Sequence, residues 1–235
     1  MAKYHSILCI SDQHFPYHHI DTIDFLRSLK KKYRPDLVIN IGDETDGHDI
    51  SYHESSKQLP GAAQELDLAI KAIKPLFRLF PEMHLMDSNH GSLVQRKANT
   101  IGLPGRVLKH TRDILGAPQD WHWHNNMIVT ASNGQEIYFC HNKSADVLKN
   151  SRAESMSFVQ GHHHGSFEIR YWANERALYF GMTIGCLIDR KSLAFAYGKT
   201  STVKPIVGVG AILNGLPRLL PMELDKNGRW TGNVP

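Results

Sequence analysis

Two stretches near the N-terminus decide the fold: SILCISDQH at residues 6–14 and LVINIGDETD at residues 37–46. Each begins with a short apolar run, which predicts a buried strand, and each ends in residue types that bind metal ions. Residues 19–33, between them, carry apolar side chains at helical spacing. A strand, a helix and a second strand in this order form a β-α-β unit, which builds a parallel sheet.

The same arrangement continues along the chain. Residues 62–80 predict a second helix, and the apolar run at 82–87 predicts a third strand that ends at Ser88-Asn89-His90. The carboxyl ends of parallel strands lie along one edge of a sheet, where ligands bind. We therefore expect the metal-binding residue types that follow the three strands to meet at this edge.

The second half of the sequence is predicted to be richer in strands. Residues 104–115 and 144–154 read as helices, and residues 121–140 read as paired strands around a turn at Asn133-Gly134. Further strands are expected at 157–160, 168–172, 177–182, 206–214 and 219–224.

Length and composition are typical of an ordered globular chain. With 235 residues, 41% of them hydrophobic, we expect one domain over 1–235 with a loose stretch at about 226–235. Three cysteines without a CxxC pair argue against a disulfide framework, and the N-terminus shows no export signal, so we expect a cytoplasmic protein. A net charge of +4 is compatible with a phosphate-bearing partner, and no membrane partner is expected.

Five clusters of possible metal ligands follow the predicted strands. They are Asp12-Gln13-His14, Gly42-Asp43 with Asp46, Asn89-His90, His141, and Gly161-His162-His163-His164. Each has an ordinary alternative, such as a helix-capping carboxylate, a turn residue or a core histidine. Because all five alternatives would have to hold together, the set predicts a two-metal hydrolytic site. In an extended segment, His162 and His164 would point to one side and His163 to the other.

The ordered clusters resemble the calcineurin-like metallophosphoesterase superfamily, whose signature runs DxH, GDxxD, GNHD or GNHE, H, and GHxH. The resemblance spans Asp12 to His164. It implies an α/β fold, a four-layer α/β/β/α sandwich of two mixed sheets, with a dinuclear metal site at the sheet edges. It also implies an enzyme, a metal-dependent phosphoric ester hydrolase.

The resemblance assigns a role to each residue of the site. Asp12, His14, Asp43 and His164 would hold the first metal, Asp43 would bridge to the second, and Asn89, His141 and His162 would complete the second. His90 would lie near the leaving group as a proton donor or transition-state stabiliser. Two cations would generate the attacking hydroxide, and Mn²⁺ is the expected metal, with Fe, Zn and Ni compatible with the same ligands.

Three motifs depart from the family pattern, and the mildest departure is Asn142 in place of Gly after His141. The third reads Ser88-Asn89-His90-Gly91, with Ser in place of Gly and Gly in place of an acidic residue, so a partner for His90 is either missing or comes from another residue, such as Asp46 or Asp87. The second lacks the Arg that follows Asp46 in the protein Ser/Thr phosphatase branch. This difference disfavours a protein phosphatase.

The expected substrate is a phosphodiester of a nucleotide or nucleic acid, which would make the chain a nuclease or a cyclic or dinucleotide phosphodiesterase. The alternatives are a phosphomonoesterase for small molecules or proteins, and a non-catalytic scaffold on the same fold. Trp121 and Trp123 could stack bases, and Arg96 and Lys97 could hold phosphates. Their ordinary roles, core packing for Trp and a solvated helix face for Arg-Lys, remain the stronger interpretation.

Overall fold

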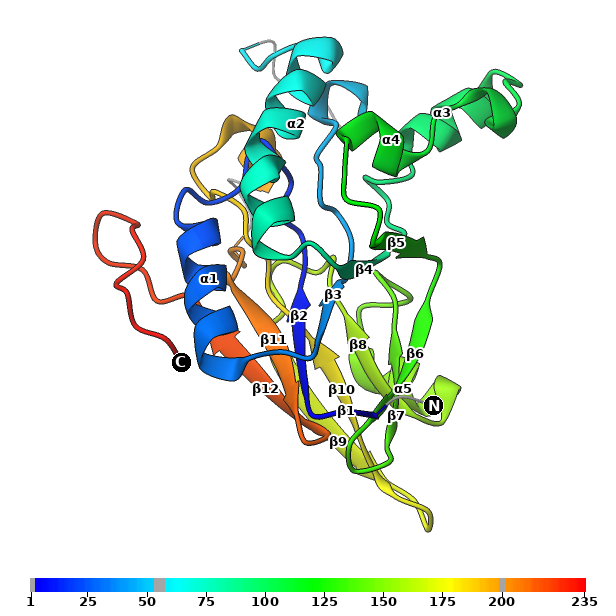
Figure 1. The fold of residues 1–235 in the computed structure, drawn as a ribbon, viewed down its shortest axis with the longest axis vertical. Helices are drawn as coiled ribbons and strands as arrows, with labels where there is room; N and C mark the ends of the chain where they lie inside the picture. Colours follow the sequence, from blue (N-terminus) through cyan, green and yellow to red (C-terminus); the bar gives the residue numbers. More distant parts are fainter. Residues whose placement is uncertain (1–2, 53–57, 199–201) are drawn as a thin grey trace.

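The computed structural model describes residues 3–52, 58–198 and 202–235. It contains two six-stranded sheets that pack face to face, with helices on their outer faces (Figure 1). This is the four-layer α/β/β/α arrangement of two mixed sheets that the resemblance implies.

The first sheet has the strand order β12-β11-β2-β3-β4-β5. Strands β2 to β5 are parallel to one another, whereas β11 is antiparallel to both β2 and β12. The bounds are β2 Ser6–Ile10, β3 Leu37–Asn40, β4 Met83–Met86, β5 Trp121–His124, β11 Gly208–Leu213 and β12 Leu216–Pro221. Helices α1 (Thr22–Tyr33) and α2 (Ala62–Leu79) pack on its outer face and bury Phe25, Ile73 and Trp121.

The second sheet has the order β1-β6-β7-β8-β10-β9 and also mixes parallel with antiparallel pairs. Its strands are β1 Lys3–Tyr4, β6 Met127–Ala131, β7 Glu136–Phe139, β8 Ser157–Gln160, β9 Glu168–Ala173 and β10 Leu178–Thr183. Helix α5 (Val147–Glu154) covers its outer face. Ile39, Phe139 and Val159 belong to the apolar layer between the two sheets.

The β-α-β unit, the second helix and the hairpin at Asn133-Gly134 are confirmed. The helical region expected around 104–115 is divided into two elements, a short 3-10 turn, η2 (Gly105–Val107), and then α4 (Thr111–Leu115). Leu108 and His110 have extended backbones, and the His110 side chain accepts a hydrogen bond from the Arg112 amide at the start of α4. A cap at this position begins a new helix.

Three other elements differ from the expectation. Helix α3 (Leu93–Thr100) was not anticipated, and β5 pairs with β4 of the first sheet instead of with β6. The last strand, β12, lies earlier than the expected 219–224, because a turn at Asn214-Gly215, where both residues have positive φ, joins it to β11. Asn-Gly is the preferred sequence for such a hairpin turn.

The C-terminal stretch, which we expected to be loose, makes defined contacts with α1. Asp21 accepts hydrogen bonds from Arg229 Nε at 2.7 Å and from the Trp230 amide at 2.9 Å. The Trp230 ring lies edge-on to Phe25, with 5.6 Å between centroids. Among the described residues, no helix combines the length and the apolar character needed to span a bilayer.

Candidate metal centre

The predicted ligands come together at the carboxyl edge of both sheets. Asp12 and His14 follow β2, Asp43 follows β3, Asn89 and His90 follow β4, His141 follows β7, and His162 and His164 follow β8. The backbone turns sharply there: Asp12, His14, Asp43 and His162 have φ angles of 52°, 50°, 53° and 66°. Such angles are rare for residues other than Gly and are retained where the surrounding structure and function require them.

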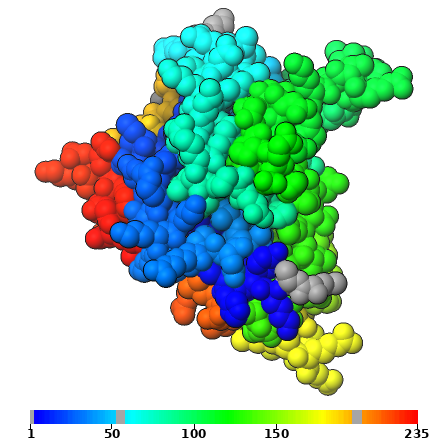
Figure 2. Space-filling view, viewed as in Figure 1, coloured from blue at the N-terminus to red at the C-terminus, as the bar shows by residue number. Residues whose placement is uncertain are grey.

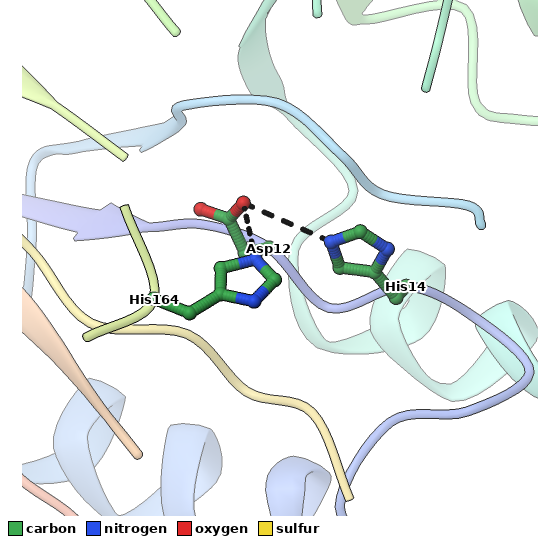
Figure 3. Close-up of side chains that lie close together, drawn as sticks. All are labelled: Asp12, His14 and His164. Carbon is green, nitrogen blue, oxygen red and sulfur yellow. Dashed lines mark hydrogen bonds and ion pairs between the residues drawn. The ribbon is translucent and has the colours of Figure 1, made fainter. Parts of the chain in front are cut away.

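The first group of ligand atoms is Asp12, His14 and His164. Figure 3 shows the Asp12 carboxylate between the two imidazoles. Asp12 Oδ1 lies 3.1 Å from His164 Nε2 and 3.8 Å from His14 Nε2. The other oxygen, Oδ2, accepts hydrogen bonds from Ser11 Oγ and from the His162 amide, which fix the carboxylate in this orientation.

The second group is Asp43, His141 and His162. Asp43 Oδ2 lies 3.2 Å from His141 Nε2 and 3.6 Å from His14 Nε2, so one oxygen faces both groups. Asn89 Oδ1 lies 2.7 Å from His141 Nε2. Hence the structure brings all seven predicted metal ligands into one continuous cluster.

The surroundings of one buried atom, His14 Nε2, indicate whether these residues fit a cation. His14 is 1% exposed, and its Nε2 has no hydrogen-bond partner in the part of the chain that the structure describes. Its Nδ1 lies 2.5 Å from Asp46 Oδ1, which turns Nε2 toward the carboxylates of Asp12 and Asp43. This nitrogen and the two carboxylate oxygens lie too far apart for a hydrogen bond. Together they are the kind of ligand set that a divalent cation accepts. The residues therefore fit a metal.

The electrostatics of the cluster lead to the same conclusion. Burial opposes a charge on His14, but the carboxylates of Asp12, Asp46 and Asp43 outweigh it and raise its pKa to about 10. Burial also opposes the charge on Asp43, yet His141, His14 and His90 hold the pKa of this carboxyl below its usual range. The buried carboxylates thus require positive charge nearby, and a divalent cation would supply it in place of protons.

Solved structures share this architecture. The chain is similar to vacuolar protein sorting 29 from Cryptosporidium parvum, with 13% sequence identity, a TM-score of 0.50, and coverage of 100% of this chain and 97% of that chain. The chain has the calcineurin-like metallophosphoesterase fold. No family model and no curated protein sequence matches it.

Two further similar structures are Vps29 complexed with zinc from Entamoeba histolytica and YfcE, a phosphoesterase from E. coli. The first has 11% identity, covers 98% of this chain and 96% of that chain, and has a TM-score of 0.49. The second has 10% identity, 96% coverage of both chains and a TM-score of 0.46. At these identities the metallophosphoesterase likeness describes the fold, and the function has to be argued from the side chains of this chain.

His90 lies at the margin of the cluster. Its amide donates to Asp43 Oδ1 at 3.0 Å, its Nδ1 donates to the backbone carbonyl of Asp46, and its ring is edge-on to His14 with 4.6 Å between centroids. Burial and the nearby His14 lower its pKa. His90 also forms a third ligand group with His14 and Asp43, so its side chain lies within reach of a cation as well as of a substrate. Of the two partners considered for it, Asp46 makes the contact.

Ser88 replaces the glycine of the metallophosphoesterase signature and has contacts of its own. Its Oγ accepts hydrogen bonds from the amides of Asp43 and Gly91, both at 3.0 Å. This hydroxyl therefore holds the Asp43 loop against the His90 loop, which a glycine at position 88 could not do. The departure from the signature adds a support for the loop that carries Asp43.

Sequence reasoning missed two supports of the site. The carbonyl of Ile41 lies 2.9 Å from His141 Nδ1 and orients the opposite nitrogen toward Asp43. Phe195 packs edge-on against His14 at 5.4 Å between centroids and covers one side of the cluster. Neither is marked by a motif. His163 has its Nε2 3.0 Å from Asn142 Oδ1, and no ligand group among the described residues includes it.

Proposed function

We propose that this chain is a dinuclear metal-dependent phosphoesterase that hydrolyses a phosphodiester of a nucleotide or nucleic acid. The position of Asp43 carries the proposal. Its Oδ2 faces His14 on one side and His141 on the other, at 3.6 and 3.2 Å. A carboxylate between two ligand groups can bridge two cations, which is the arrangement of hydrolytic two-metal sites.

In this proposal, the ligands divide into two sets that share Asp43. Asp12, His14 and His164 hold one cation, and Asn89, His141 and His162 hold the other. Mn²⁺ is the metal that we propose, and mixed imidazole and carboxylate ligands also accept Fe, Zn and Ni. When bound, the two cations would polarise the phosphate ester and lower the pKa of water so that hydroxide forms near neutral pH.

The protein side chains position the reacting groups. Asp43 is held by the Ser88 hydroxyl through its own amide, and Asp46 orients His14. The Nδ1 of His90 donates to the Asp46 carbonyl, which leaves Nε2 as the ring nitrogen available to a substrate. In the doubly protonated ring, with Nδ1–H held by this carbonyl, Nε2–H can stabilise the developing negative charge or give its proton to the leaving oxygen.

A basic surface next to the site supports a diester substrate with further phosphates. Arg96 Nη2 donates to the carbonyl of Asn89, and the Arg96 guanidinium lies 5.1 Å from the centre of the Tyr52 ring. Lys97 Nζ lies 4.4 Å from the same ring, which is 59% exposed. Cations beside an exposed aromatic ring are a common way to bind single-stranded nucleic acid.

The test compares bis-p-nitrophenyl phosphate with p-nitrophenyl phosphate, using Mn²⁺-loaded wild type and Asp43→Ala. We expect hydrolysis of the diester by the wild type, its loss in Asp43→Ala, and two metal ions per wild-type chain by elemental analysis. Absence of hydrolysis of these compounds, DNA and RNA above the Asp43→Ala background would refute the enzyme and favour a scaffold. Activity on the monoester alone would refute the diester preference.

A further inference from the structure

A cavity of about 580 Å³ adjoins the metal centre. It lies between α2 on one side and α3 and α4 on the other, the elements at one end of the molecule (Figure 1). In the space-filling view, the cyan surface of α2 adjoins the green surface of α4 (Figure 2). His90 and Gly91 belong to its lining, so the cavity is continuous with the site that we assign to the phosphate.

The lining is largely aliphatic. On α2, Ala62, Leu66 and Ala69 present one face of the helix to the cavity, and Val94 of α3 and Ile114 of α4 lie around the same space. Leu66 and Val94 are 40% and 47% exposed, although both are apolar. Covering them with an apolar group removes this surface from water, which favours binding.

The charged groups of the lining do not make the cavity a site for a second phosphate. Glu65 is buried, and its two carboxylate oxygens accept hydrogen bonds from the amides of His48 and Asp49 at 2.8 and 3.2 Å. Its charge therefore serves the backbone turn at residues 48–50. Among the described lining residues, Lys109 is the single Lys or Arg, and its side chain is exposed.

We propose that the phosphodiester substrate carries one bulky, uncharged, apolar ester group and that this cavity holds that group while the phosphate lies at the metal centre. The inference rests on the proposed function and narrows its substrate class to a diester that joins a nucleotide to an apolar group, which excludes nucleic acid. The cavity and the metal centre share His90, which is why we propose an ester group as the occupant. A group bonded to the phosphate oxygen next to His90 would extend directly into the aliphatic space. Pockets of this size enclose most of the surface of a small organic group.

The test measures binding instead of turnover. Methylphosphonate and naphthalen-2-ylphosphonate are titrated into the Mn²⁺-loaded protein by calorimetry, using wild type, Leu66→Ala, Val94→Ala and the control Leu68→Ala. Leu66 and Leu68 both belong to α2 and are 40% and 39% exposed, but the cavity lining includes only Leu66. The pair therefore separates loss of a cavity contact from loss of an exposed leucine.

We expect wild type to bind the naphthyl compound at least about tenfold more tightly than the methyl compound. Leu66→Ala and Val94→Ala should each weaken naphthyl binding by roughly three- to tenfold, leaving methyl binding unchanged. Leu68→Ala should leave both constants unchanged. Equal affinity of wild type for the two compounds, or equal losses in Leu66→Ala and Leu68→Ala, would overturn the inference.

The outcome is separable from that of the proposed function. Hydrolysis of bis-p-nitrophenyl phosphate without the naphthyl preference would refute the cavity assignment and leave the enzyme intact. Preferential binding of the naphthyl compound without hydrolysis of any diester would support the apolar ligand and refute the enzyme.

Discussion

The metal-ligand cluster and the apolar cavity meet at His90, but they are built in different ways. The cluster consists of buried and half-buried polar side chains at the ends of strands, held by a sharply turned backbone and by hydrogen bonds. The cavity is lined largely by aliphatic side chains, many of them on three helices, and some of them are exposed. In the function that we propose, the sheet edge fixes the chemistry, while the helices inserted between the strands select the substrate.

The largest effect should come from breaking the cluster at Asp43. Asp43→Asn keeps the shape of the side chain but removes the charge that faces His14 and His141. We expect kcat/KM for bis-p-nitrophenyl phosphate to fall by at least about 10³-fold, with fewer than two metals retained per chain. Asp87→Asn is the control, since Asp87 is exposed just after β4. A similar loss in both variants would contradict a special role for Asp43.

The second largest effect should come from changing His90, where the cluster and the cavity meet. His90→Gln should lower kcat for the diester by roughly 10²- to 10³-fold and leave the metal content at two ions per chain. His163→Gln is the matched control, because His163 belongs to the motif but contacts Asn142 instead of the cluster. A loss of metal in His90→Gln would show that His90 acts as a ligand, as its proximity to His14 and Asp43 allows.

The difference between the metal-ligand cluster and the apolar cavity also explains which parts of the molecule could be predicted from the sequence. Asp12, Asp43 and His141 directly follow strands, so a local pattern of apolar run and polar residue located them. Because parallel strands end at one edge, the topology alone brought distant motifs together. The β-α-β unit predicted the parallel part of one sheet, whereas the four-layer arrangement of two mixed sheets was implied by the resemblance to the metallophosphoesterase signature.

The cavity and the supports of the site could not be predicted in this way. Helix α3 is short, its Ser92 makes no side-chain cap, and it is stabilised by burying Leu93 and Ala98 in the folded chain. The carbonyl of Ile41 orients His141 without any side-chain signal. In contrast, Asn214-Gly215 is a typical hairpin-turn sequence, and it correctly marks the end of β11 and the start of β12.

A smaller effect should follow from loosening the support of the cluster. Ser88→Ala removes the hydroxyl that accepts hydrogen bonds from the amides of Asp43 and Gly91. We expect metal affinity, measured by competition with a chelator, to fall by about tenfold, because outer-shell contacts typically contribute 10- to 100-fold. Ser92→Ala is the control, since its hydroxyl donates to the Ser88 carbonyl and does not contact Asp43. Unchanged affinity in Ser88→Ala would leave this serine without a role in the site.

The smallest effect concerns a contact remote from both regions, between α1 and the C-terminal segment. Hydrogen bonding to Arg229 lowers the pKa of Asp21 from 3.8 to about 2, although burial opposes the charge. A carboxyl whose pKa is lower in the folded state stabilises the fold above its unfolded pKa, and this contribution is lost as the pH falls through the folded value. The contribution is modest because Arg229 is largely exposed.

Asp21→Asn should therefore lower the free energy of unfolding by about 1 kcal/mol at neutral pH, and the difference from wild type should shrink between about pH 4 and pH 2. Urea denaturation at several pH values measures it. Asp24→Asn, which breaks an exposed ion pair with Arg27 in the same helix, should cost less than about 0.5 kcal/mol. Diester hydrolysis and naphthylphosphonate binding should be unchanged in both variants, since stability at this end of α1 is separate from the metal centre and the cavity. A pH-independent difference would show that packing of Trp230 on Phe25, and not the charge on Asp21, holds the segment in place.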